Sequence, residues 1–256
     1  MQKLRLRYAK RGRLRFTSHR DVARAFERAL RRAGVPMAYS QGFNPHPKIS
    51  WIGAAPTGVA SEAEYVEVQV VERVDPAALG RALDSALAPG LDVLEVVEAG
   101  PGALAERVEA SRWRIALPGV AAGELAAAVT ALLAAESVEV ERLTKDGRRL
   151  IDARPAVMSA EVIDSAALPA DSPDAVGIDM PGPGDSCGIL LVVVRQTTPA
   201  VRPDDVLSAL RAVAALEPPV PAKATRMAQG RLDGAGGLSD PLAPDRVAVG
   251  GAGGES

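Results

Sequence analysis

The chain has 256 residues, of which 47% are hydrophobic, and this is enough for a globular protein of two domains. Its single cysteine, Cys187, excludes an internal disulfide and a thiolate metal cluster built from this chain alone. The longest fully apolar run, Ile189 to Val194, is too short for a membrane span, and the N-terminal residues carry no apolar signal core. We therefore expect a cytoplasmic protein that has no membrane segment and no cofactor.

Basic residues gather near the N-terminus. Residues 1–51 hold 13 of the 30 Lys and Arg residues but two of the 32 acids, a balance of +11 (13 − 2), whereas the remainder carries −13 (17 − 30). The same stretch holds both histidines and six of the eight aromatic residues. A cationic, aromatic-rich region on an otherwise acidic chain predicts a surface for a polyanion or an acidic partner.

The first hundred residues alternate strand and helix patterns. Apolar residues and arginines alternate over 4–8 and 13–16, which predicts a hairpin that turns at Gly12 and carries its arginines on the outer face. Ser18 and Asp21 form a capping pair for a helix that ends near Ala33. The remaining patterns predict strands near 36–39, 65–71 and 91–97, and a helix over 75–87. This order is that of a split βαβ, ferredoxin-like domain.

The second half repeats this order weakly. Its patterns predict a strand over 113–117, a helix over 122–134, a hairpin over 138–153, a strand over 188–195, a helix over 203–215 and a strand over 222–227. We predict an α+β fold of two tandem ferredoxin-like halves with antiparallel sheets, over 1–100 and 110–229. Residues 165–186 form a predicted loose insertion, and residues 230–256 a predicted disordered tail.

Several arginines of the first predicted helix share one exposed side, because four of them recur at spacings of four, four and three. With the arginines of the predicted hairpin and one nearby lysine, they are candidates for contacts with RNA phosphates. The alternatives are a solvated helix face and a surface for an acidic protein. The candidates are Arg13, Arg15, Arg20, Arg24, Arg28, Arg31, Arg32 and Lys48, and Arg5 and Arg7 lie on the same predicted face.

Residues 41–48 contain two prolines and a glycine, which forbid regular structure and fix the backbone. A rigid loop with polar groups is a way to preorganise a ligand site. The alternative is a structural crossover in which the polar groups satisfy the loop's own backbone. The candidate ligand-binding residues of the loop are Gln41, Gly42, Phe43, Asn44 and His46.

His19 and His46 are a candidate general acid and base for the cleavage of RNA. The alternative is that His19 completes a helix N-terminus and His46 packs within its loop. A metal site is not predicted, since no third ligand beyond Asp21 is evident. Arg154 and Arg202 each precede a proline that holds them extended, so they either enlarge the basic surface or pair with acids.

Three stretches of the chain resemble a known bacterial family. They are residues 13–21, residues 26–34 and residues 38–48, the last reading Ala-Tyr-Ser-Gln-Gly-Phe-Asn-Pro-His-Pro-Lys, with weaker matches at 151–155 and 201–206. The chain is similar over about residues 2–227 to the radical-SAM-linked family of domains of unknown function. Its members are separate proteins or are fused behind a cobalamin-binding-type radical SAM protein. The resemblance implies a radical SAM partner but supplies no reaction.

The chain cannot itself be the radical SAM enzyme, because three cysteines are needed to hold the [4Fe–4S] cluster. We expect a non-catalytic accessory module that binds RNA or presents a substrate, acting with a radical SAM enzyme in tRNA or rRNA modification. Tyr39, Phe43 or Trp51 would stack a base if exposed. The alternatives are a metal-independent endoribonuclease that uses His19 and His46, and a protein adaptor that does not bind RNA.

Overall fold

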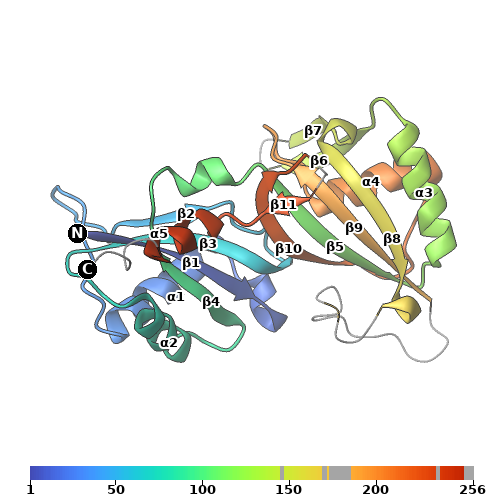
Figure 1. The fold of residues 1–256 in the computed structure, drawn as a ribbon. Coiled ribbons are helices and arrows are strands. Elements are labelled where there is room, and N and C mark those ends of the chain that lie inside the picture. The colour runs from blue at the N-terminus through green and yellow to red at the C-terminus, as the bar shows by residue number, and fades with distance from the viewer. Residues whose placement is uncertain (145–146, 169–171, 173–185, 235–236, 251–256) are drawn as a thin grey trace. The chain divides into compact units, whose positions relative to one another are not determined.

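The computed structural model describes residues 1–144, 147–168, 172, 186–234 and 237–250, the side chains of 247–250 excepted. It is an α+β protein, and the chain forms two compact units (Figure 1). The first unit comprises residues 1–108 and 239–256, and the second comprises residues 109–238. The C-terminal part of the chain therefore returns to the first unit.

The first unit begins with strands and helices in the order β-α-β-β-α-β. Its elements are β1 Gln2–Lys10, η1 Gly12–Phe16, α1 His19–Arg32, β2 Ile49–Ile52, β3 Ala60–Val70, α2 Pro76–Ala86, β4 Leu91–Glu98, η2 Leu104–Arg107 and α5 Ala243–Gly250, with η denoting a 3-10 helix. The strands pair antiparallel in the order β4-β1-β3-β2. Residues Leu4, Leu6 and Tyr8 of β1 face a core that they share with α1 and α2.

The predicted N-terminal hairpin is wrong. β1 pairs with β3 on one side and with β4 on the other, so neither of its edges is left for residues 13–16. Those residues form η1 instead, in which the Leu14 amide donates to the Arg11 carbonyl at 3.1 Å. Gly12 does have the positive φ expected of it, +55°. The turn is therefore where the sequence indicated, but it leads into a helix.

The helix predictions of the first half are confirmed. Ser18 is the N-cap of α1, and its hydroxyl accepts from the Asp21 amide at 3.2 Å. Val22, Phe26, Ala29 and Leu30 form the buried side of this helix. α2 is capped in the same way by Asp75. The predicted strand at 36–39 is reduced to isolated bridges from Met37 and Tyr39, and β2 was not predicted.

The second unit has strands in the order β10-β5-β9-β8, again all antiparallel. Its elements are β5 Ala110–Pro118, α3 Ala122–Ala134, β6 Glu139–Thr144, β7 Gly147–Asp152, η3 Arg154–Ala156, β8 Val157–Asp164, η4 Ser165–Ala167, β9 Cys187–Arg195, α4 Pro203–Ala214 and β10 Lys223–Leu232. The predicted helices and the predicted hairpin are present. However, within the described residues β6 and β7 pair only with each other, and β9 has β8, which was not predicted, as its neighbour on the side away from β5.

Two predicted irregular segments have different outcomes. Residues 165–186 fall mostly outside the described residues. Disorder beyond residue 230 is wrong for the described part of that segment, where β10 continues to Leu232 and is followed by β11, Leu238–Ser239, and by α5. Leu242 and Asp245 have no exposed side-chain surface. In Figure 1, α5 lies on the side of the first unit's strands opposite to α1 and α2.

Candidate nucleic-acid interface

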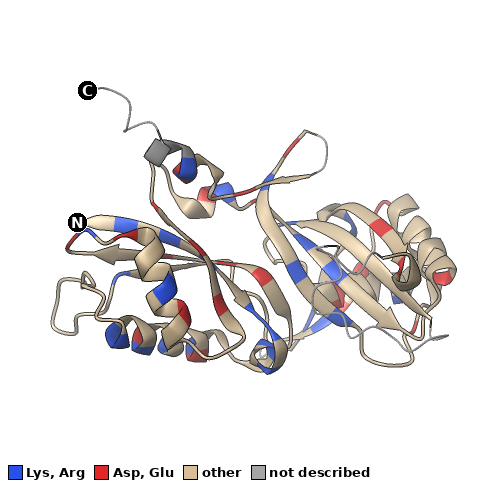
Figure 2. Ribbon diagram, turned by 60° about the horizontal axis from the view of Figure 1, so that its bottom comes forward, with Lys and Arg blue, Asp and Glu red and all other residues tan. Residues whose placement is uncertain are grey.

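The candidate arginines of α1 are exposed to solvent. Arg20, Arg24, Arg28 and Arg31 form a row, and within the part of the chain that the structure describes only Arg24 has a carboxylate nearby, that of Asp21 at 4.0 Å. The side chains of Arg24 and Asp21 are both more than half exposed. Arg32 donates to the Ala86 carbonyl at 3.0 Å. Within the described residues, the side chains of Arg20, Arg28 and Arg31 make no hydrogen bond or ion pair. The charged positions of this helix are coloured in Figure 2.

The spacing of the arginines along α1 does not stabilise the helix. Like charges four residues apart destabilise a helix by about 0.2–0.5 kcal/mol per pair, and Arg20, Arg24 and Arg28 form two such pairs. A row at this spacing rises about 6 Å from one guanidinium-bearing residue to the next. The row thus presents repeated donors along one side of α1, of which only Arg24 has a described carboxylate nearby, and this suits a ligand with repeated negative charge.

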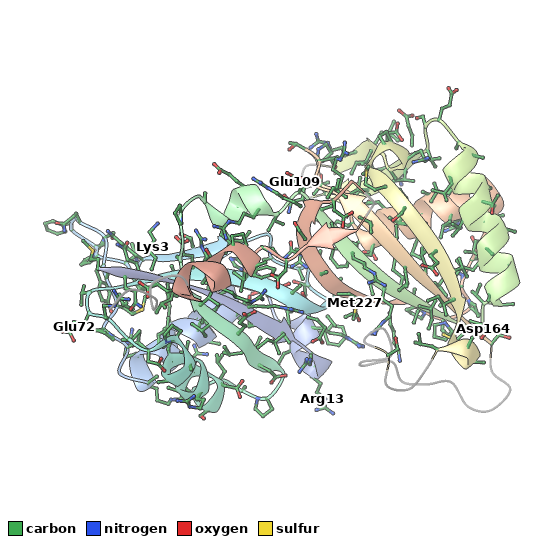
Figure 3. The ribbon with its side chains drawn as sticks, in the orientation of Figure 1. Lys3, Arg13, Glu72, Glu109, Asp164 and Met227 are labelled. Atoms are coloured by element: carbon green, nitrogen blue, oxygen red, sulfur yellow. The ribbon has the colours of Figure 1, made fainter. Side chains whose placement is uncertain are left out.

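The arginines of η1 are placed at the start of α1. Arg13, labelled in Figure 3, projects away from the strands and is exposed. The guanidinium of Arg15 lies 4.7 Å from the centroid of the Phe16 ring, and this ring is 59% exposed. Phe16 was not among the predicted site residues, although its place just after Arg13 and Arg15 was a usable signal.

Arg5 and Arg7 do not belong to this surface. Arg5 is 2% exposed and bonds to Glu67 of β3, to Asp245 near the C-terminus and to the Gly102 carbonyl. Arg7 donates to the Glu62 carbonyl at 2.9 Å. Arg5 therefore lies under Asp245, Arg7 bonds to the neighbouring strand, and both arginines serve internal pairing.

The loop after α1 is closed at its base by backbone hydrogen bonds. The Ser40 amide donates to the His46 carbonyl at 2.8 Å, and the His46 amide donates to the Ser40 hydroxyl at 3.0 Å. Tyr39 and Pro47 form a bridge, and the Lys48 amide donates to the Ala38 carbonyl at 2.8 Å. The five residues 41–45 project beyond this base as a defined tip.

The side chains of the loop point outward. Phe43 is fully exposed and Tyr39 is half exposed. Gln41, Asn44, His46 and Lys48 are also exposed, and none of their side chains bonds to a described residue. The hydrogen bonds at the base of the loop come from backbone groups and from the Ser40 hydroxyl. The side chains of Gln41, Asn44, His46 and Lys48 are therefore not what holds the loop closed. The same side chains remain accessible to a ligand.

The two histidines lie at different ends of α1. His19 is its first residue, and its ring lies 5.3 Å from that of Trp51, edge to face. Trp51 in turn contacts Phe26 and Tyr8. His46 belongs to the loop that follows the helix, and a helix of 14 residues is about 20 Å long. Among the described residues, no hydrogen bond or ring contact joins the two histidines, and the ring contacts of Trp51 tie it into the core.

The two secondary candidates, Arg154 and Arg202, differ in whether their side chains have partners within the fold. Arg154 donates to the carbonyls of Leu133, Ala135 and Val157 at 3.0–3.1 Å and so caps the end of α3. Arg202 is the N-cap of α4, and its backbone amide donates to the Asp205 carboxylate. Asp205 also forms a bidentate pair with Arg142. The Arg202 side chain is exposed, whereas that of Arg154 is committed to the fold.

Other site classes find little support among the described residues. They hold no group of three His, Cys, Asp or Glu side chains that could bind a metal ion. In the same part of the chain, no helix is long and apolar enough to cross a membrane. Cys187 is buried, and this burial raises the pKa of its thiol.

The comparisons with known proteins give a family. No curated protein matches the chain. The model of a bacterial family described as "Uncharacterized protein conserved in bacteria (DUF2344)" matches residues 3–203. The match includes η1, α1, the loop after it and most of the second unit, that is 201 of the 256 residues (203 − 3 + 1). The chain therefore belongs to this uncharacterized bacterial family.

Proposed function

We propose that this protein is a non-catalytic RNA-binding module that presents RNA to a radical SAM enzyme acting on tRNA or rRNA. The observation that carries the RNA-binding part is the exposed row of Arg20, Arg24, Arg28 and Arg31, which has one weak carboxylate contact in the described structure. Guanidinium groups of this kind bind phosphates bidentately. The radical SAM partner rests on the family resemblance of the motif at residues 38–48.

The proposal places RNA on the α1 side of the first unit. The strand order β4-β1-β3-β2 and the element order of this unit support a ferredoxin-like domain, and β10-β5-β9-β8 supports a second one with the β6-β7 hairpin inserted. RNA-binding domains of this class use the open face of the sheet. Here that face carries Leu104 and Leu242, so α1 and its flanking loop are the accessible basic surface.

The two parts of the surface have separate tasks in this proposal. The arginines of α1 and η1 hold the phosphate backbone, which gives affinity without sequence preference. Phe43 and Tyr39 offer exposed rings for an unpaired base. The 41–48 loop follows α1 after eight residues, 33–40, so a strand bound along the end of α1 reaches the loop. A single-stranded region of RNA is the ligand that uses both parts.

The test of the arginine row compares two charge-matched variants. One carries Arg20→Glu, Arg24→Glu and Arg31→Glu, and its control carries Arg81→Glu, Arg148→Glu and Arg195→Glu, at exposed positions outside α1. We expect single-stranded RNA to bind the first variant at least about tenfold more weakly, and the logarithmic salt slope to fall by about 0.7 for each phosphate that the variant no longer neutralises. Equal weakening in both variants, or no binding by the wild type, would refute the proposal.

The test of the loop uses Phe43→Ala and Tyr39→Ala. Removal of one stacked base costs about 1–3 kcal/mol of binding free energy, and this cost does not depend strongly on salt. We therefore expect weaker RNA binding with an unchanged salt slope, in contrast to the arginine variant. Leu143→Ala in β6, which removes an 81% exposed apolar side chain of the second unit, is the control for the loss of exposed apolar surface. Full RNA affinity in Phe43→Ala would remove the loop from the binding surface.

A further inference from the structure

The C-terminal segment, defined here as Asp240–Arg246, occupies the face of the first unit opposite to α1. Leu242 is fully buried in a cluster with Ala63, Tyr65, Val97 and Leu104. Three residues later, the Asp245 side chain is also fully buried. These two side chains are one turn apart along the segment and enter the same face. The segment is therefore anchored by one apolar and one acidic side chain.

The Asp245 carboxylate is held by three converging donors. Its Oδ1 accepts from Arg5 Nη1 at 2.7 Å and from the Gly100 amide at 2.8 Å, and its Oδ2 accepts from Arg107 Nη1 at 2.8 Å. Arg5 is 2% exposed and Arg107 is 11% exposed at the side chain. Charge-assisted bonds from buried guanidinium groups are strong and geometrically selective. This is a built site for a carboxylate.

The site is cationic without its occupant. Arg5 retains Glu67, which is shared with Lys3, so the departure of Asp245 leaves three cations and one carboxylate. Arg107 keeps the Pro101 carbonyl but is separated from both Asp245 and the Pro241 carbonyl. Arg107 then has no acidic partner among the contacts just described, and Arg5 keeps Glu67 alone, which is costly unless another anion binds.

The residues that form the carboxylate site lie within the family match, whereas the C-terminal segment that fills the site lies outside it. The family match at residues 3–203 includes β1 and η2, and thus Arg5, Gly100 and Arg107, but ends before the C-terminal segment. The second unit separates the two parts of the first unit in the chain. The matched residues therefore include the donors of the site but do not reach the carboxylate that occupies it.

We propose that this face of the first unit is a binding site for an acidic protein segment of the form Leu-x-x-Asp, and that the C-terminal segment is an intramolecular occupant that such a partner segment displaces. The occupant defines the ligand chemistry: a leucine for the cluster around Leu104, and a carboxylate three residues later for Arg5 and Arg107. The site is independent of the RNA surface on α1. A partner protein thereby docks on one face while α1 stays accessible.

The experiment uses the full-length chain and a fluorescent peptide with the sequence of residues 239–250. A tethered competitor acts at an effective concentration in the millimolar range, so the wild type should bind the peptide weakly. A variant with Leu242→Ala and Asp245→Ala vacates the site and should bind the peptide at least about tenfold more tightly. The same peptide with Asp245→Asn should not bind this variant more tightly than the wild type. The full-length control Glu136→Ala, which removes an exposed carboxylate elsewhere, should bind the original peptide as weakly as the wild type does.

A second measurement, hydrogen exchange, uses the wild-type protein and so does not depend on the folding of the double variant. Hydrogen exchange of the wild type should show that the amides of Ala243, Asp245 and Arg246, which donate within the segment, exchange by local opening that is insensitive to low denaturant. Exchange of these amides only with global unfolding would mean that the segment is a permanent part of the fold, and would overturn the proposal. Equal peptide binding by the wild type, the double variant and Glu136→Ala would also overturn it.

Discussion

The arginines of α1 and those of β1 come from the same short N-terminal stretch but have opposite environments. Arg5 of β1 is buried between Glu67 and Asp245, whereas Arg28 of α1 is exposed and has no described partner. Both sets alternate with apolar residues at the period of their element. The difference is whether another segment of chain covers the polar side, and that segment can be more than 200 residues away. Local charge thus identifies a basic region but not its accessible part.

Removal of Asp245 is the largest expected effect on the buried set. Asp245→Ala leaves Arg5 and Arg107 without this carboxylate, and breaking a buried pair in this way costs about 3–5 kcal/mol. We expect the free energy of unfolding in urea to fall by that amount. Glu136→Ala removes an exposed carboxylate and should change stability by less than about 0.5 kcal/mol. Similar small decreases in both variants would remove the contrast between buried and exposed charges.

Acid should release the same carboxylate. Burial alone would raise the pKa of Asp245, but the hydrogen bonds from Arg5, Arg107 and Gly100 outweigh it and hold the pKa below its usual value. Since the folded pKa is depressed, this contribution is present above the ordinary pKa of about 3.9 and disappears as the pH falls through the folded value.

The charged groups around Asp245 are Arg5 of β1, Arg107 of η2, Glu67 of β3 through Arg5, and Glu95 of β4 through Arg246. Because the other carboxylates also titrate, the comparison with Asp245→Ala isolates its share. We expect urea midpoints to fall from pH 5 to pH 3 by more in the wild type than in the variant. Parallel pH profiles would contradict this assignment.

Arg154 and Arg202 offer the same comparison, of a bonded with an exposed arginine side chain, in the second unit, where we expect smaller changes in stability. Arg154→Ala removes donors from three carbonyls at the end of α3, and we expect a decrease in stability of about 2 kcal/mol, within the range for a charged hydrogen-bonding group. Arg202→Ala should cost less than about 0.5 kcal/mol, since it is the backbone amide that bonds to Asp205. Thermal or urea unfolding measures both. Equal decreases would mean that the Arg202 side chain has a structural role.

Neutralisation of the exposed row should have the smallest effect on stability. Arg28→Gln relieves the like-charge repulsion with Arg24, so we expect the free energy of unfolding to stay the same or to rise by up to about 0.5 kcal/mol. RNA affinity should nevertheless fall. A marked decrease in stability, measured by urea unfolding, would show that Arg28 is part of the folded structure and not of a binding surface.

Much of the secondary structure could be predicted, because caps and periodic patterns are local. Ser18 and Asp75 fixed the starts of two helices, and the alanine-rich stretch of α3 was assigned with its correct bounds. The errors have long-range causes. Residues 13–16 alternate like a strand, but both edges of β1 are occupied by β3 and β4. β8 was overlooked because the hairpin before it took its place in the predicted order.

The candidate site was predictable in part for the same reason. The exposure of the α1 arginines follows from helical periodicity, and the rigidity of the 41–48 loop follows from its prolines. The pairing of Arg5 with Asp245 spans 240 residues and has no local signature. The contact of His19 with Trp51 likewise depends on the tertiary path after α1, which residue types alone do not set.

The return of the C-terminal segment to the first unit has a consequence for biosynthesis. During translation, Arg5 and Arg107 emerge from the ribosome well before Asp245. The interval from Val108 to Asp245 is 137 residues (245 − 108), which corresponds to roughly 7–27 s at ordinary elongation rates. Over this time Leu242 and Asp245 are not yet available, so in the nascent first unit the apolar cluster around Leu104 and the guanidinium groups of Arg5 and Arg107 are uncovered. A chaperone or a partner segment that binds this face would therefore act before the chain is complete.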